Sequence, residues 1–117
     1  MTYDAGVNAG HIGPVRLVQV LCENPARIFG LYPRKGTIAI GSDADLVVFD
    51  PSRSVTICAA NQHSRAGYTL YEGRQVLGWP EASFQRGRRV LWQGEVVAQP
   101  GQGRFLPTLT SPAEPLG

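Results

Sequence analysis

The sequence has 117 residues, which is enough for one domain and too few for a typical α/β barrel. With 43% hydrophobic and 17% charged residues, its composition is that of a globular protein and excludes wholesale disorder. The net charge of +2 does not favour nucleic acid as a partner. No apolar run could span a bilayer, and the N-terminus lacks the regions of a signal peptide, so we expect a cytoplasmic protein.

Few side chains form a chemical cluster in the sequence. Arg86, Arg88 and Arg89 are the one local group of positive charges, and we expect them at a solvated strand edge or an interface rather than in a phosphate-binding patch. Cys22 and Cys58 lie far apart and show no CxxC or Cys/His spacing. This predicts two reduced thiols, one of them on the core face of a helix.

Two consecutive helices are predicted near the N-terminus. In the pair Gly13-Pro14, the glycine suits an N-cap and the proline suits the first helical position. The pair Asn24-Pro25 repeats this start signal, so a second, short helix is expected to run to about Phe29. Gly30 suits the left-handed position that commonly ends a helix. The stripe that the first helix would bury comprises Val18, Leu21 and Cys22.

Short strands are predicted after residue 33. The alternating "TIAIG" (37–41) and the apolar run within "DLVVFD" (45–50) predict two strands, the second of them buried on both faces. A turn at 50–52 leads to a third strand in 54–58, and residues 61–80 are expected to be irregular. Residues 83–101 predict paired strands with a tight turn at Gln93-Gly94. The last residues, 108–117, are expected to form a flexible tail.

Asp43, Asp45 and Asp50 surround the predicted apolar strand. Carboxylates so close in sequence could bind a metal ion or perform acid–base chemistry. They could equally mark the two ends of a strand.

The stretch from Asn24 to Pro51, "NPARIFGLYPRKGTIAIGSDADLVVFDP", resembles the C-terminal region of the hydantoinase and dihydropyrimidinase branch of the amidohydrolase superfamily. "GTIAIGSDADLVVFD" is shared across many amidohydrolases, and "GVNAGHI" (6–12) is similar to the approach to the last barrel helices. The motifs typical of the narrower branch are "GLYPRKG" (30–36), "YEGRQVLGWPE" (71–81), "RGRRV" (86–90) and "GQGRFL" (101–106). The resemblance covers residues 3–107, with one departure: Arg65, Ala66 and Gly67 precede Tyr68 where the family often has an Asn-Val-Asp-Tyr-like stretch.

The resemblance implies a mainly β fold with N-terminal α-helices. Family members combine a (β/α)8 barrel with a small composite β-sandwich built from both chain ends. Residues 1–34 would then be terminal barrel helices, residues 35–107 the C-terminal portion of the sandwich, and residues 108–117 the tail. In this fold Asp43 would bond backbone N–H groups in a turn, and Asp45 and Asp50 would mark the entry and exit of a sandwich strand.

The resemblance also implies a metal-dependent hydrolase acting on the C–N bond of cyclic amides such as hydantoins, dihydropyrimidines or allantoin. In the family two divalent ions, usually zinc, are held by histidines, an aspartate and a carboxylated lysine, all upstream of the matching region. We therefore expect no catalytic, substrate-binding or metal-ligating residue and no cofactor in this chain, and we predict that the chain alone is inactive. His11 and His63 are expected at the surface or in hydrogen bonds, and Lys35 lies in a turn rather than at the end of a barrel strand.

Expected partners are the missing N-terminal barrel region or identical subunits in a homo-oligomer, without nucleic acid or membrane. Unpaired strand edges and uncovered helix faces would make the isolated chain marginally stable and prone to self-association. Two alternatives remain open: a non-catalytic scaffold related to dihydropyrimidinases, and a free-standing β-module for oligomerisation.

Overall fold

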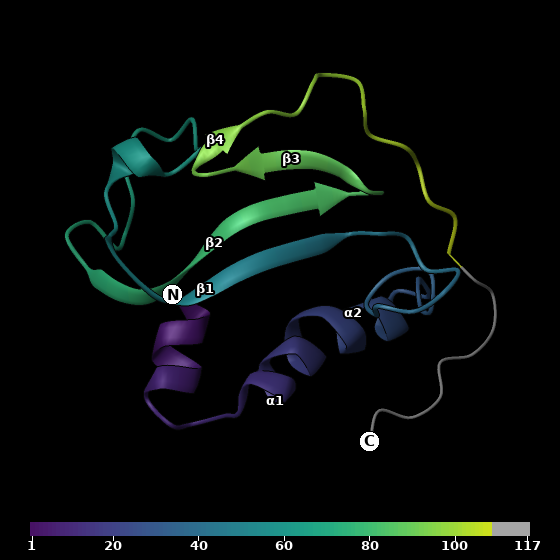
Figure 1. Cartoon of the computed structure of the whole chain (residues 1–117), viewed down its shortest axis with the longest axis horizontal. Coiled ribbons are helices and arrows are strands. Elements are labelled where there is room, and N and C mark those ends of the chain that lie inside the picture. The colour runs from purple at the N-terminus through teal and green to yellow at the C-terminus, as the bar shows by residue number, and fades with distance from the viewer. Residues whose placement is uncertain (109–117) are drawn as a thin grey trace.

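A row of helical turns lies along one side of a four-stranded antiparallel sheet (Figure 1). This arrangement comes from a computed structural model that describes residues 1–108. The fold class expected from the sequence, mainly β with N-terminal helices, is confirmed. The predicted tail lies outside the described residues from position 109 onward. Within the described range, none of the helices has the length and apolar character needed to cross a membrane.

One continuous helix replaces the two that were predicted. It comprises α1 (Pro14–Val18), the π-helical turn η2 (Gln19–Glu23) and α2 (Asn24–Ile28). Its start at Gly13, with φ −79° and ψ 162°, and its end at Gly30, with φ 64°, are as predicted. The predicted break between two helices at Asn24 is wrong, because that residue is itself helical, with φ −60° and ψ −46°. The wider π turn gives the ring of Pro25 room against the preceding turn, and the helix continues through it.

A further helical turn, η1 (Asp4–Asn8), was not predicted and fastens the N-terminus to the sheet. The side-chain amide of Asn8 donates to the Leu77 carbonyl at 2.8 Å, and the Leu77 N–H donates to the Asp4 carboxylate at 3.1 Å. The rings of Tyr3 and Phe49 also pack together, with centroids 4.6 Å apart. Because these three contacts join residues 46 to 73 positions apart, the local sequence pattern carries little sign of this turn.

The strands follow one another in the order β1-β2-β3-β4. Each strand pairs antiparallel with the next, and the four are β1 (Leu46–Thr56), β2 (Gln75–Gln85), β3 (Arg88–Trp92) and β4 (Glu95–Val96). A short 3-10 turn, η3 (Ala59–Asn61), follows β1. The predicted tight turn at Gln93-Gly94 is confirmed, with φ of 49° and 88°. Arg86-Gly87 forms a second turn of the same kind, with φ of 48° and 76°.

Three strand predictions are wrong. The turn expected at 50–52 is an irregularity within β1, so Asp50 does not mark a strand exit. The strand β2 begins at Gln75, inside the stretch expected to be irregular, and it accommodates Pro80 where the register with β1 shifts. Residues 37–41 form no strand; Ile38 is 87% exposed and has no neighbouring strand to pair with.

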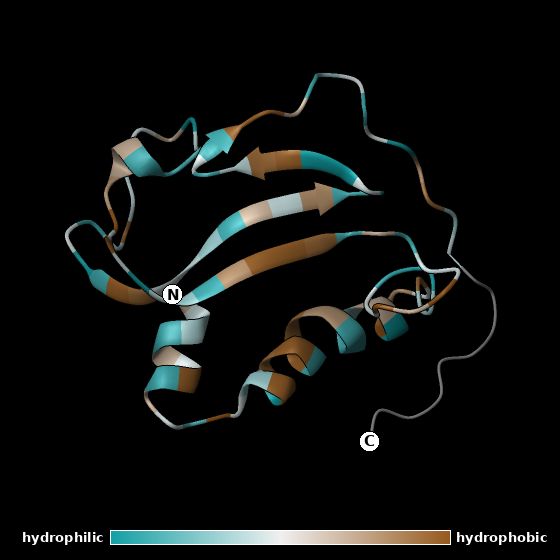
Figure 2. Ribbon diagram, viewed as in Figure 1, coloured by the Kyte–Doolittle hydropathy of each residue, from teal (hydrophilic) through white to brown (hydrophobic). Residues whose placement is uncertain are grey.

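Little of the described chain is deeply buried: its buried hydrophobic residues are Ala26, Ile57, Val76 and Ala82. The prediction that residues 46–49 are buried on both faces is wrong, since Val47 is 64% exposed. The physical reason is that β1 is an edge strand, and no Cα of the 14–28 helix lies within 8 Å of a Cα of β1. Figure 2 shows the apolar stretch of β1 facing the apolar turns of that helix across this gap. Cys22 is likewise exposed rather than part of a core.

Candidate functional site

The carboxylates that precede β1 are held by cations. Asp43 accepts hydrogen bonds from Arg34 Nε at 3.1 Å and from Lys35 Nζ at 2.9 Å, and Lys35 also contacts the carboxylate of Asp45. The other oxygen of Asp45 accepts the backbone N–H of Arg86 at 2.8 Å. The partners of Asp43 are therefore charged side chains, which corrects the prediction of backbone N–H groups. Asp45 lies at the entry to β1, as predicted, and ties it to the β2–β3 turn.

The pKa values of this cluster favour its charged state. Burial acts to lower the pKa of Lys35, but its hydrogen bonds to Asp45 and Asp43 outweigh burial and the pKa is raised. The hydrogen bond from Lys35 lowers the pKa of Asp43. For Asp45, burial acts to raise the pKa, yet the bonds from Lys35 and from the Arg86 N–H lower it overall. All three groups are ionised at neutral pH and paired, which fits a structural role and leaves neither carboxyl group of this cluster suited to proton transfer.

Asp50 is separate from this cluster. Its carboxylate accepts the backbone N–H of Ser52 at 2.8 Å and the Ser52 hydroxyl at 2.7 Å. These bonds lower the pKa of Asp50 and hold the irregular part of β1. The three aspartates that are close in sequence thus have different partners.

The described residues do not form a metal site. Within residues 1–108, no three His, Cys, Asp or Glu side chains converge in a way that could hold a metal ion. The ring Nε2 of His63 contacts the Gly94 carbonyl at 2.9 Å, which fits the hydrogen-bonding role expected of it, and His11 is exposed. Lys35 is occupied by its two carboxylates. The residues present therefore do not fit the two-metal centre that the family resemblance implies.

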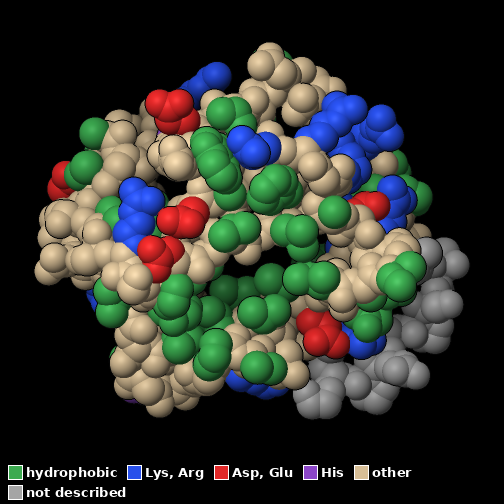
Figure 3. Space-filling model, viewed as in Figure 1, with side chains coloured by type: hydrophobic (Ala, Val, Ile, Leu, Met, Phe, Trp, Pro, Cys, Tyr) green, Lys and Arg blue, Asp and Glu red, His purple; other side chains and the backbone are tan. Residues whose placement is uncertain are grey.

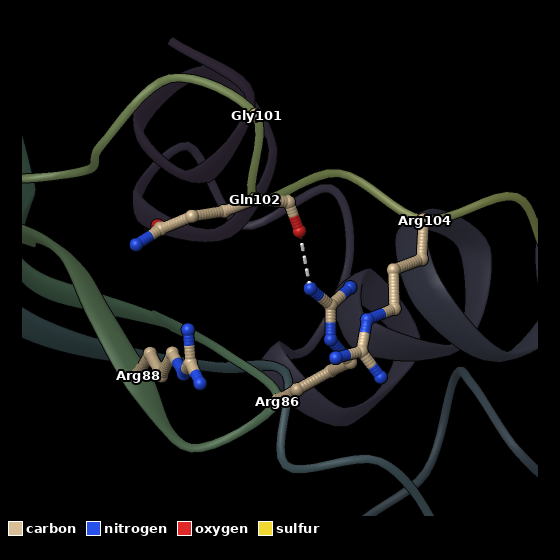
Figure 4. Close-up of a pocket in the computed structure, with 5 residues that line it drawn as sticks. All are labelled: Arg86, Arg88, Gly101, Gln102 and Arg104. Carbon is tan, nitrogen blue, oxygen red and sulfur yellow. Dashed lines mark hydrogen bonds between the residues drawn. The ribbon is translucent and has the colours of Figure 1, made fainter.

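The predicted arginine cluster separates in the structure. Arg86 and Arg88 line a polar hollow of about 320 Å³ together with Gly101, Gln102 and Arg104 (Figure 4). The guanidinium group of Arg86 donates to the backbone carbonyl of Gln102. Arg89 instead lies over the ring of Trp92, 4.1 Å from its centroid. Sequence reasoning missed Arg104, although it lies in the "GQGRFL" motif, because the contact joins segments 16 or more residues apart.

A second hollow, of about 620 Å³, is mainly apolar and lies between the 14–28 helix and β1. Figure 3 shows hydrophobic side chains gathered around it. Its lining includes Val18, Cys22, Ala26, Phe29, Ile38 and Val47. The helix and the strand thus each have an apolar face, as their sequence patterns indicate, but no segment among the described residues covers these faces.

A comparison of the sequence with protein families identifies the family of this chain. The sequence model of the Amidohydrolase family matches residues 2–90. The chain belongs to this family. The match covers most of the helical part and of the sheet, which confirms the family expected from the sequence motifs.

The relatives of this amidohydrolase chain include hydantoinases and dihydropyrimidinases. It is 45% identical over 101 residues to a D-hydantoinase of Streptomyces coelicolor, covering 86% of this chain and 22% of the relative. It is 39% identical over 111 residues to dihydropyrimidinase 1 of Caenorhabditis briggsae, covering 95% of this chain and 23% of the relative. The crystal structure of a dihydropyrimidinase from Brevibacillus agri superposes with a TM-score of 0.87 at 37% identity, over 90% of this chain and 23% of that one. The chain therefore spans between a fifth and a quarter of the length of these relatives.

Proposed function

We propose that this chain is the C-terminal segment of a metal-dependent cyclic amidohydrolase that hydrolyses the C–N bond of hydantoins or dihydropyrimidines. The observation that carries the proposal is the 45% identity to a D-hydantoinase over 86% of this chain. Residues 1–34 would belong to the end of the catalytic barrel and residues 35–107 to the small β-sandwich. The cytoplasmic location expected from the sequence stays a prediction.

In this proposal the metal site lies in another part of the polypeptide, and the 117-residue chain alone has no hydrolase activity. The support is that the acidic and histidine side chains described here are either paired with cations, bonded to backbone or separate. Two metals in such an enzyme would generate a hydroxide nucleophile and polarise the substrate carbonyl. No residue among 1–108 is assigned to that step.

The proposed partners are the remainder of the amidohydrolase polypeptide and identical subunits. The apolar hollow between the 14–28 helix and β1 supports this, because exposed apolar surface beside an unpaired strand edge favours association. The absence of nucleic acid and membrane among the partners remains a prediction from the sequence.

An antibody against this chain tests the proposal in the source cells. We expect it to detect a polypeptide about four times as long as the chain, because the 101 matched residues make up 22% of the D-hydantoinase. That polypeptide, once immunopurified, should hydrolyse hydantoin or dihydrouracil and lose activity with a metal chelator. A full-length polypeptide that binds no metal and turns over neither substrate would instead support the non-catalytic scaffold.

The purified 117-residue chain provides the second arm of the test. Added zinc should give no turnover of hydantoin or dihydrouracil above the rate with zinc alone. Turnover that survives repurification would refute the assignment of the metal site to another part of the polypeptide. Detection of the 12.7 kDa chain by itself in cells would favour the free-standing β-module, which the exposed edge of β1 would suit.

A further inference from the structure

We propose that Arg86, Arg88 and Arg104 form a binding site for a small, doubly charged oxyanion of the phosphate or dicarboxylate type. The site lies at the turn between β2 and β3.

Three segments bring the arginines together. Arg86 is in the β2–β3 turn, Arg88 begins β3, and Arg104 comes from the loop that follows β4. Their side chains line the same hollow of about 320 Å³ (Figure 4). Gln102, from the same loop as Arg104, adds a side-chain amide to the lining. The hollow is therefore rich in N–H donors.

Among the described residues, these arginines form no ion pair with an acidic side chain. Within residues 1–108, no Asp or Glu oxygen lies within 4.0 Å of a guanidinium nitrogen of Arg86, Arg88 or Arg104. The nearby carboxylate of Asp45 is already bonded to Lys35 and to the backbone of Arg86. Three like charges around one hollow repel each other, and a bound anion would relieve that repulsion.

The conformation of Arg86 supports a site that is organised in advance. Its φ of 48° lies in the left-handed region, where a turn of this type favours Asn, Asp or Gly. A long cationic side chain at such a position is uncommon and is fixed here from both ends. The backbone N–H donates to Asp45, and the guanidinium group donates to the Gln102 carbonyl. An arginine has five N–H donors, so others remain for a ligand.

The ligand class follows from the guanidinium groups and the surroundings. The planar fork of N–H donors matches two oxygens of a phosphate or a carboxylate. In the part of the chain that the structure describes, the hollow has no aromatic side chain in its lining on which a base could stack. With a net charge of only +2, the chain also lacks the extended basic surface of a nucleic-acid binder. A small free anion is thus the ligand we expect.

Isothermal titration calorimetry of the whole chain with inorganic phosphate, and separately with malonate, tests the site at constant ionic strength. We expect saturable binding of at least one of the two anions. The anion that binds more tightly shows whether the site prefers a phosphate or a dicarboxylate. Arg88→Gln and Arg104→Gln should each weaken binding about tenfold, since each removes charge-assisted hydrogen bonds. Arg65→Gln, which removes the same charge from an exposed loop, should leave the affinity unchanged.

Arg88→Lys and Arg104→Lys keep the charge but lose the fork, and they should bind more weakly than the parent chain while retaining its circular dichroism spectrum. The proposal is overturned if neither anion binds. It is also overturned if the Arg65→Gln control weakens binding as much as Arg104→Gln does. Because the assay measures binding and not hydrolysis, its result is independent of the proposed amidohydrolase activity.

Discussion

Replacing Gly36 by alanine should be among the most damaging small substitutions in this chain. The residue has a φ of +82°, and an added Cβ would lie 2.5 Å from the Cβ of Ala26 and 2.8 Å from the carbonyl oxygen of Cys22. The glycine therefore lets the turn after the helix lie directly on the helix surface. The left-handed conformation costs an alanine about 1–2 kcal/mol, and relieving the overlap costs about 1–3 kcal/mol more. We expect a loss of roughly 2–5 kcal/mol in the free energy of unfolding.

Gly41 provides the matched control. Its φ of +91° is similar, but an added Cβ would meet no atom within 4 Å. Gly41→Ala should therefore lose only the conformational part, about 1–2 kcal/mol. Urea unfolding followed by far-UV circular dichroism measures both variants, and a slope of about 1–3 kcal/mol per molar urea converts the losses into shifts of the midpoint. Equal losses for the two variants would refute the close packing of residue 36 on the helix.

Three further substitutions test the ion cluster, a turn and the exposed edge. The pKa of Lys35 is raised, so its stabilisation is fully present below its ordinary pKa of 10.5 and is lost as the pH rises through the folded-state pKa. The pKa values of Asp43 and Asp45 are lowered, so their stabilisation is present above 3.8 and is lost as the pH falls through the folded-state values. Lys35→Met should flatten both arms of a plot of urea midpoint against pH, and an alkaline arm that persists would contradict the pairing. Gln93→Asn should stabilise the chain by about 0.5–1 kcal/mol, because asparagine tolerates the left-handed φ of 49° better than glutamine; a lower urea midpoint would contradict this. Val47→Lys should reduce concentration-dependent association in sedimentation velocity, because it places a charge on the apolar edge strand. A parent chain that is monomeric at all concentrations, with a sharp two-state transition, would argue against self-association.

Features that depend on a few neighbouring residues were predictable from the sequence. The helix start at Gly13-Pro14, its end at Gly30 and the tight turn at Gln93-Gly94 each require a particular backbone conformation that these residue types favour. The predictions that failed depended on distant partners. Asp50 and the two residues after it look like a turn, but pairing with β2 resumes at Ser54, so the stretch between them is an irregularity within one strand.

The two hollows differ in how much of them the sequence could reveal. Arg86 and Arg88 were visible as a cluster, whereas Arg104 joins them only because the loop after β4 returns to the β2–β3 turn. These segments could not be paired from the sequence, since no periodicity links positions so far apart. The sequence predicted the uncovered helix face beside the apolar hollow, whereas the strand on its other side was expected to be buried on both faces.

The sequence pattern and the structure disagree most at the apolar strand 46–49. The pattern predicts more burial of these side chains than the structure shows. A continuous apolar run is typical of a strand covered on both faces, yet Val47 is 64% exposed and β1 has a neighbour on one side only. Apolar residues of the helix and of β1 line the same hollow, and no Cα of the 14–28 helix lies within 8 Å of a Cα of β1. One further segment between the helix and β1 would remove the apolar surfaces of both from water. Moving the helix onto β1 instead would break the contact of Ala26 with Gly36. This pattern supports the proposal that the chain is one segment of a larger amidohydrolase fold, and the chain covers 22% and 23% of two of the relatives compared above.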